Sequence, residues 1–145
     1  MLPMLFIALG QPTVCYLFAT TLGLQISVNV IYGIIGILPM AVFNIALGLL
    51  CGSILEVKQV GGLCGALLTN LSAWLSGVWF DLELVGGLFK RIAKLLPFLH
   101  AAEMEKALFS GNFDLAAAQI LPVLIYSVLA TMAAVFCFLG QMNKQ

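Results

Sequence analysis

The N-terminal segment of the chain reads MLPMLFIALGQPTVCYLFATTLGLQISVNVIYGIIGILPMAVFNIALGLLCGSIL (residues 1–55), and none of its 55 residues is Asp, Glu, Lys or Arg. At about 1.5 Å of rise per residue, this segment corresponds to roughly 80 Å of helix. That length exceeds one crossing of a ~30 Å hydrocarbon core and suits two crossings joined by a turn. The segment therefore predicts two membrane-spanning helices.

Two shorter charge-free stretches follow, at residues 59–80 and 115–143, and each has the length of one further crossing. Over the whole chain, 63% of the 145 residues are hydrophobic and 8% are charged, whereas soluble domains carry about 25% charged residues. Such a chain lacks the side chains for a polar surface, so the soluble class is excluded and membrane lipid is the expected surrounding. The six basic residues balance the six acidic ones, and nothing predicts a nucleic-acid partner.

The polar breaks divide the chain into four expected spans and one insert, within a single transmembrane domain of residues 1–145. The spans are placed at about residues 3–24, 32–55, 60–80 and 115–140, and the insert at 81–114. We therefore predict an all-α fold: a polytopic membrane helical bundle with four transmembrane helices and a re-entrant or amphipathic helical hairpin before the last one.

Turn residues and prolines leave two boundaries open. The polar cluster at residues 25–29 supplies the expected first turn, but Gly-Gln-Pro at residues 10–12 also interrupts the apolar run and would mark an earlier turn. Pro122 either kinks the interior of the fourth span or lies in its first turn, with Asp114 capping a short helix before it.

Small residues recur at four-residue spacing in the second and third spans, as in Gly48 and Gly52 and in Gly61 and Gly65. Small side chains let helix backbones approach closely, which is how spans associate when apolar side chains gain little by leaving lipid. We interpret these faces as helix-packing surfaces. The packing is either within the chain or against a second copy, and the number of small faces favours a partner.

The polar residues deepest in the second and third spans are Asn44, Asn70, Ser72 and Ser76. Polar groups inside a membrane need partners and often mark the path of a transported substrate. These four residues are therefore candidates for a substrate path. The alternative is that they form hydrogen bonds between helices, because Asn and Ser commonly join spans in this way.

The insert holds nine of the twelve charged residues, and its first part has the pattern of an amphipathic helix. Across residues 84–96, apolar side chains follow one helical face, while Lys90, Arg91 and Lys94 share the opposite face. A helix of this kind lies along a membrane interface.

A second short helix is expected after the first. Pro97 ends the amphipathic helix, and the next helix is predicted from His100 to Ser110, with Gly111 at its C-terminal cap. Loops as long as this insert tend to be functional. The alternative is a surface-lying linker that only connects two spans.

No set of catalytic residues emerges from the sequence. The chain lacks the G-x-x-x-x-G-K-[ST] motif for nucleotide phosphates and the H-E-x-x-H and G-x-S-x-G motifs. The single histidine, His100, has no second imidazole or nearby thiol for a metal site, and the four cysteines lie in apolar stretches without C-x-x-C spacing. We expect no enzymatic activity, no cofactor and no metal in this chain.

Several segments follow one another at a characteristic spacing: NLSAWLSGVWF at residues 70–80, LVGG at 84–87, IAKLLPFLHA at 92–101 and Ser-Gly at 110–111. Together they resemble the ABC transporter type-2 permease family. In that family a span ending in a Ser-Gly and aromatic pattern leads into two short external re-entrant helices around a Pro-aromatic step, and one last span follows. The resemblance covers about residues 35–140 and is best at residues 70–111.

The resemblance implies a membrane-spanning permease subunit of an ATP-driven exporter, a multi-pass protein of a bacterial plasma membrane. Such a permease forms the substrate path as a homodimer or heterodimer, and a separate cytosolic ATP-binding cassette subunit binds ATP and Mg and hydrolyses the ATP. The resemblance also implies external gate helices, and the residues of this chain at the matching positions are Lys90, Arg91, Lys94, Pro97 and His100.

Two other functions remain as alternatives. Members of the family usually have six spans, and this chain matches only the last four. A truncated permease remnant, or a small membrane interaction protein without transport activity, is therefore the first alternative. An oligomeric channel is the second, and it is disfavoured because no span carries a polar stripe long enough to line a water-filled pore.

The resemblance places both termini and residues 56–59 in the cytosol and the insert outside. Counting basic residues gives the opposite orientation, because the insert holds Lys90, Arg91, Lys94 and Lys106. We follow the resemblance, since basic residues on an amphipathic helix rest at an interface.

Overall fold

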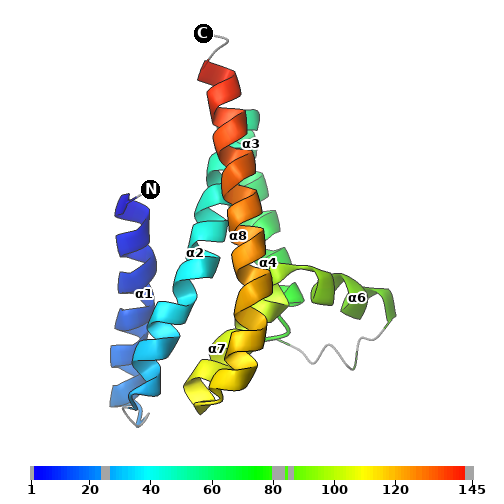
Figure 1. Ribbon diagram of the computed structural model, residues 1–145. Coiled ribbons are helices and arrows are strands. Elements are labelled where there is room, and N and C mark those ends of the chain that lie inside the picture. Colours follow the sequence, from blue (N-terminus) through cyan, green and yellow to red (C-terminus); the bar gives the residue numbers. More distant parts are fainter. Residues whose placement is uncertain (1, 24–26, 80–83, 85–86, 143–145) are drawn as a thin grey trace.

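In the computed structural model, which describes residues 2–23, 27–79, 84 and 87–142, every regular element is a helix (Figure 1). The elements are, in chain order, α1 (Leu2–Thr21), α2 (Asn29–Ile54), α3 (Val57–Val60), the π-helix η1 (Gly61–Leu68), α4 (Thr69–Leu75), α6 (Gly87–Leu95), α7 (Pro97–Ser110) and α8 (Phe113–Met142). The expected all-α fold class is confirmed for this described part of the chain.

Three helices are long and apolar enough to cross a membrane: α1 from Pro3 onward, α2 and α8. They correspond to the expected spans at residues 3–24, 32–55 and 115–140, with ends that differ by a few residues, and Leu24 lies outside the described residues. A continuous helix satisfies its own backbone hydrogen bonds, so charge-free sequence of this length can enter lipid in this form.

Three prolines lie inside these long helices without ending them. Pro12 is within α1, Pro39 within α2 and Pro122 within α8. The alternative first turn at residues 10–12 is therefore wrong, because α1 continues through it. The turn lies between Thr21 and Asn29 instead, near the polar cluster, of which residues 25 and 26 fall outside the described residues.

The start of α8 decides between the two expected positions of Pro122, the interior or the first turn of the fourth span. α8 begins at Phe113, so Pro122 lies well beyond its first turn. The cap is Asn112 and not Asp114, because the Leu115 N–H donates to Asn112 Oδ1 at 3.4 Å. Asp114 lies inside the first turn of α8, where a negative charge interacts favourably with the helix dipole.

The third expected span, residues 60–80, departs most from a regular α-helix. α3, η1 and α4 follow one another with helical backbone angles at Val60 and Thr69, so residues 57–75 form one helical run. In a π-helix the N–H groups bond five residues back, and the Thr69 hydroxyl likewise donates to the Cys64 carbonyl, 3.1 Å away and five residues earlier. The run ends at Leu75, and Phe80 lies outside the described residues.

In the described part of the insert, α6 and α7 are separated by a break at Pro97, as expected, whereas the expected re-entrant hairpin is not confirmed. Leu96 is extended, with φ −91° and ψ 153°, and Pro97 begins α7, because its missing N–H is not needed in a first turn. The second helix therefore starts three residues before His100. α7 packs against α2 and α8, whereas α6 stands out sideways from the bundle (Figure 1). Val85 lies outside the described residues.

The C-terminal end of α7 is capped as expected by Gly111. Its φ of +76° is a left-handed conformation that glycine adopts without a steric penalty. The Gly111 N–H donates to the Leu108 carbonyl at 3.2 Å, and the Asn112 N–H donates to the Ala107 carbonyl at 2.9 Å. These bonds satisfy the last carbonyls of α7 and turn the chain into α8.

The core lies where α2, α4, α6, α7 and α8 meet. The Phe43 ring of α2 meets the Phe98 ring of α7 edge-on, with 5.9 Å between centroids, and the Tyr126 ring of α8 at 6.5 Å. Leu75 of α4 and Ala93 of α6 are buried in the same cluster. Edge-to-face aromatic pairs add about 0.5–1.5 kcal/mol beyond the burial of their area. This cluster therefore fixes five helices relative to one another.

Close contact between α2 and α7 depends on two glycines that the sequence pattern did not single out. Gly33 and Gly36 are buried residues of α2. A Cβ atom at Gly33 would overlap the Phe109 ring of α7, and one at Gly36 would overlap the Leu108 side chain. The helices approach so closely at this point because these two residues have no side chains.

The glycines that we expected to mediate packing face open space instead. A Cβ atom added to any of them would have no described neighbour within 4 Å outside its own helix backbone: Gly48, Gly52, Gly61 and Gly65. These glycines therefore do not pack against another helix within the described part of the chain. Contact of these faces with a second copy stays a prediction.

Replacing Gly33 with Leu is expected to lower the free energy of unfolding by about 1–3 kcal/mol, the usual range for overpacking, because the Phe109 ring occupies the required space. The matched variant Gly48→Leu should leave the free energy of unfolding unchanged or raise it by up to about 1 kcal/mol, because glycine is a poor residue for a helix interior. Thermal unfolding in detergent measures both effects. Equal destabilisation by the two variants would contradict the close α2–α7 contact.

Candidate functional site

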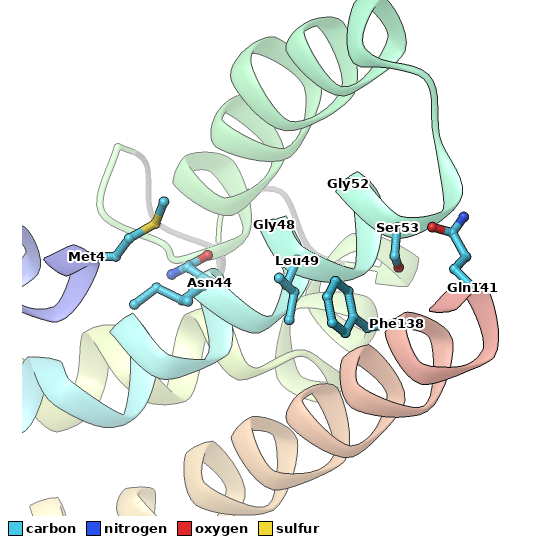
Figure 2. A pocket seen from close by; sticks show the side chains of 9 residues that line it. Met4, Asn44, Gly48, Leu49, Gly52, Ser53, Phe138 and Gln141 are labelled. Carbon is cyan, nitrogen blue, oxygen red and sulfur yellow. The ribbon is translucent and has the colours of Figure 1, made fainter. Parts of the chain in front are cut away.

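A groove of about 540 Å³ runs between the C-terminal half of α2 and the end of α8 (Figure 2). Its lining comes from three helices: Met4 of α1, Asn44, Ile45, Gly48, Leu49, Gly52 and Ser53 of α2, and Phe138 and Gln141 of α8. Gly48 and Gly52 leave the space that larger side chains would fill. The open glycines of the second span therefore create the groove.

A smaller hollow of about 280 Å³ adjoins the groove and shares Asn44 and Gly48 with it. Its other wall comes from the helical run at residues 57–75, where Cys64, Thr69 and Ser72 line it. Thr69 follows directly after the π-helix, and π-helical turns occur frequently at functional sites. The structure thus brings Asn44 and Ser72, two of the expected substrate-path residues, into one hollow.

The other two expected substrate-path residues lie elsewhere. Asn70 lines a separate hollow together with Leu71 and Trp74. Ser76 follows the last residue of α4, and its hydroxyl donates to the Ala73 carbonyl at 2.8 Å. The sequence could not separate the four residues, because depth along a span does not determine the face on which a side chain lies.

The four polar candidates all bond to their own helices. The Asn44 amide nitrogen donates to the Met40 carbonyl at 3.0 Å, and the Asn70 amide nitrogen to the Ala66 carbonyl at 2.7 Å. The Ser72 hydroxyl donates to the Thr69 carbonyl at 2.8 Å. Among the described residues, these bonds are therefore within helices, and hydrogen bonding to another helix stays an untested alternative for these side chains. Each side chain thus donates one hydrogen bond to its own helix, and the oxygens keep the capacity to accept a hydrogen bond from a ligand.

Hydrogen bonding between the long helices involves a serine that the sequence analysis missed. The Ser127 hydroxyl of α8 lies 2.6 Å from the Pro39 carbonyl of α2 and 2.8 Å from the Val123 carbonyl of its own helix. Its single hydrogen thus has two acceptors, one of them on the neighbouring helix. The sequence did contain a signal for this bond, because Ser127 is a polar residue in the middle of an apolar span.

Two side chains of the bundle hold the C-terminal end of α6. The Tyr126 hydroxyl of α8 donates to the Leu95 carbonyl at 2.5 Å, and His100 Nε2 of α7 lies 2.9 Å from the Lys94 carbonyl. The last carbonyls of a helix have no partner within that helix, so these bonds satisfy groups that α6 cannot satisfy itself. His100 Nδ1 lies 2.5 Å from Oε1 of Gln119 in α8.

The expected gate-helix residues therefore have different positions. Pro97 is buried at the start of α7, and His100 joins α6, α7 and α8. Arg91 and Lys94 are exposed on α6, and Lys90 is half-buried there. Of these residues, His100 has the clearest positioning role, because it holds the end of one insert helix on the other.

α6 also exposes a row of apolar side chains at i, i+4 and i+7 spacing. Leu88 is 73% exposed, Ile92 42% and Leu95 69%, while Ala93 on another side of the helix is fully buried against the core. An apolar face without a protein partner beside a basic face is typical of a helix in a membrane interface. The amphipathic pattern expected for this segment is present in α6.

Replacing Tyr126 with Phe is expected to lower the free energy of unfolding by about 1 kcal/mol, the usual effect of losing one hydrogen bond, and to increase amide exchange in α6. The ring remains beside Phe43, while the Leu95 carbonyl loses its donor. The control is Tyr32→Phe, because Tyr32 contacts Phe113 through its ring. Hydrogen exchange followed by mass spectrometry reports α6 directly, and unchanged exchange in Tyr126→Phe would contradict this role.

The site offers an apolar groove with a few polar groups. Among the described residues, no group of three His, Cys, Asp or Glu lies close enough to hold a metal ion. The four cysteines are free thiols. Comparison of the sequence and structure with protein-family models, curated proteins and solved structures finds no match.

Proposed function

We propose that the chain is the membrane-spanning permease subunit of an ATP-driven ABC exporter, which forms the substrate path as a dimer and is driven by a separate ATPase subunit. The observation that carries this proposal is the insert before α8. A helix that lies sideways, α6, is followed at Pro97 by a second helix, α7, which packs on α2 and α8. This is the order of elements that the resemblance to type-2 permeases implies.

The proposal includes four spans. α1, α2 and α8 supply three helices of sufficient length and apolarity. The fourth would be the run at residues 57–75, in which α3, η1 and α4 join without a break in helical backbone. Its composition supports this, because the run contains no charged residue after Lys58.

The interfacial position proposed for α6 rests on the two faces of this helix. Leu88, Ile92 and Leu95 are exposed on one side, and Arg91 and Lys94 are exposed basic residues. A helix with an exposed apolar face and a basic face suits a position among lipid head groups.

The substrate path would follow the groove and the adjoining hollow. Asn44 and Ser72 supply polar groups there, and Gly48 and Gly52 leave space. A second permease subunit would close this side of the bundle. ATP binding to the partner ATPase would change the transport state by stabilising one arrangement of the dimer over another.

One observation favours a second function, a membrane interaction protein without transport activity. The glycines at 48, 52, 61 and 65 present small faces that meet nothing within the described part of the chain. Faces of this kind bind other membrane helices through close backbone contact. The two functions differ in whether an ATPase accompanies the chain in its native membrane.

Topology is tested by cysteine labelling in a variant whose four native cysteines are replaced by Ala. Cysteines at Lys58 and Lys106 are expected to react with a membrane-impermeant maleimide from opposite sides of the membrane. Two further positions extend the test. A cysteine at Lys90 should be labelled from the same side as Lys106, and a cysteine at Lys144 from the same side as Lys58. Labelling of the Lys58 and Lys106 positions from one side would contradict four spans.

Function is tested by affinity purification of the chain from its native membrane. We expect a cassette ATPase to copurify, and the chain alone to show no ATPase activity above background. A native complex without an ATPase would favour the membrane interaction protein instead, and ATP hydrolysis by the isolated chain would contradict the proposed division of roles.

The groove can then be tested within the purified complex. Asn44→Leu would replace the polar amide shared by the groove and the adjoining hollow with an apolar side chain of similar shape, and it is expected to reduce export at least tenfold while leaving the complex intact. Asn70→Leu is the matched control, because Asn70 makes the same kind of bond to its own helix but lines a different hollow. Equal loss of export in both variants would remove the groove from the substrate path.

A further inference from the structure

Glu105 of α7 has a carboxyl group enclosed in the contact between α7 and α2. Both of its oxygens are inaccessible to solvent, and neither has a hydrogen-bond partner among the described residues. The wall of this enclosure is α2 at Gly36, where an added Cβ atom would lie 2.9 Å from Glu105 Oε1. A carboxyl group without a donor in such a position is unusual, because buried polar groups are almost always paired.

The surroundings of Glu105 offer no counter-charge from α2. That helix contains no Asp, Glu, Lys, Arg or His. On the α1 side, the titratable group that interacts with Glu105 is the Tyr16 hydroxyl, which bears no positive charge. Glu105 therefore faces apolar and neutral groups on this side of α7.

The remaining titratable groups near this contact belong to α7 itself, α8 and α6. α7 itself has Glu103, Lys106 and His100, of which His100 bonds to Gln119 and to the Lys94 carbonyl. α8 has Asp114 in its first turn, and α4 has no charged residue. α6 has its three basic residues, Lys90, Arg91 and Lys94.

Burial without a partner disfavours the ionised carboxylate much more than the neutral acid. Desolvation raises the pKa of Glu105 from its ordinary value of 4.5 to about 7. The neutral acid is thus the form that fits the enclosed position. Ionisation would leave a negative charge against Gly36 and the apolar side chains around it, unless α7 moved so that water reached the carboxylate.

We propose that Glu105 is a proton-binding site that controls the docking of α7 on α2. With a proton on Glu105, α7 docks closely against Gly33 and Gly36. Without it, the carboxylate draws water into the contact and α7 loosens from α2. A proton is the ligand that the site accepts, because no group of three His, Cys, Asp or Glu among the described residues could hold a metal ion beside it. The proposal does not depend on a transport function.

The direction of the pH effect follows from proton linkage. The folded, docked state binds the Glu105 proton more tightly than a state in which the carboxyl group is in water. Its contribution to docking is therefore complete below pH 4.5 and is lost as the pH rises through about 7. Docking should be close at acidic pH and loose at alkaline pH.

The test uses the full chain in lipid nanodiscs with one spin label on α2 and one on α7. The labelled cysteines replace Ile31 and Lys106, which are both exposed, in a background whose native cysteines are Ala. We expect one short distance at acidic pH and a second, longer distance at alkaline pH, with a midpoint near pH 7. A distance distribution that does not change with pH would overturn the proposal.

Variants assign the effect to Glu105. Glu105→Gln keeps the shape of the neutral acid and is expected to hold the short distance at every pH. Glu103→Gln, two residues away, and His100→Gln, which removes the single imidazole, should keep the pH-dependent change. A transition that persists in Glu105→Gln, or that disappears in one of the two controls, would overturn the assignment.

A second measurement keeps the proposal testable if Glu105→Gln does not fold. The infrared carbonyl stretch of a protonated carboxylic acid should appear in the unmodified chain below the midpoint and disappear above it. Exchanging sodium for potassium at constant pH should leave this transition in place. A midpoint near the ordinary pKa of Glu, or one that follows the cation, would contradict a proton site.

Discussion

The aromatic contact of Phe43 with Phe98 and Tyr126 is the interaction on which the rest of the structure depends. It joins α2, α7 and α8 at one point, and the buried side chains of α4 and α6 complete the same cluster. Tyr126 has two functions there, because its ring packs in the core while its hydroxyl holds the end of α6. A helix that stands sideways from a bundle has few contacts of its own. The bonds from Tyr126 and His100 to its last carbonyls and the burial of Ala93 in the core together determine where α6 lies, and with it the apolar and basic faces that would meet the membrane interface.

Glycine has opposite consequences in the two halves of α2. In the first half, Gly33 and Gly36 let α7 approach until its side chains fill the space above them. In the second half, Gly48 and Gly52 meet no neighbouring helix, and the same lack of side chains produces a groove. Spacing alone cannot distinguish these outcomes, since both pairs lie on an apolar helix at similar intervals. The difference arises because the insert supplies a partner helix, α7, only for the first half.

The features that sequence predicts well here are those with a local cause. Absence of charge predicts α1, α2 and α8, because lipid excludes charged residues, and the end of α7 follows from the left-handed conformation of Gly111. The features that it misses depend on distant partners. The groove needs α2 and α8 together, and the bond from Tyr126 joins residues 31 positions apart. The π-helix is missed for a different reason: the sequence of η1 is as apolar as a regular span, and a shift in hydrogen-bond register leaves no mark on composition.

Glu105 shows how a local pattern can conceal a functional position. In the sequence it is one of three charged residues within α7, and a charged residue in a short amphipathic segment ordinarily faces water. The glycines of α2 alter this, because they bring the two helices close enough to enclose the carboxyl group. A carboxyl group held in this way makes the docking of α7 sensitive to a proton, whereas the aromatic cluster at the other end of α7 contains no ionisable carboxyl group and remains in place. α7 is thus anchored at Phe98 and responsive at Glu105, about two helical turns away. Any movement caused by ionisation would therefore be a tilt about the anchored end.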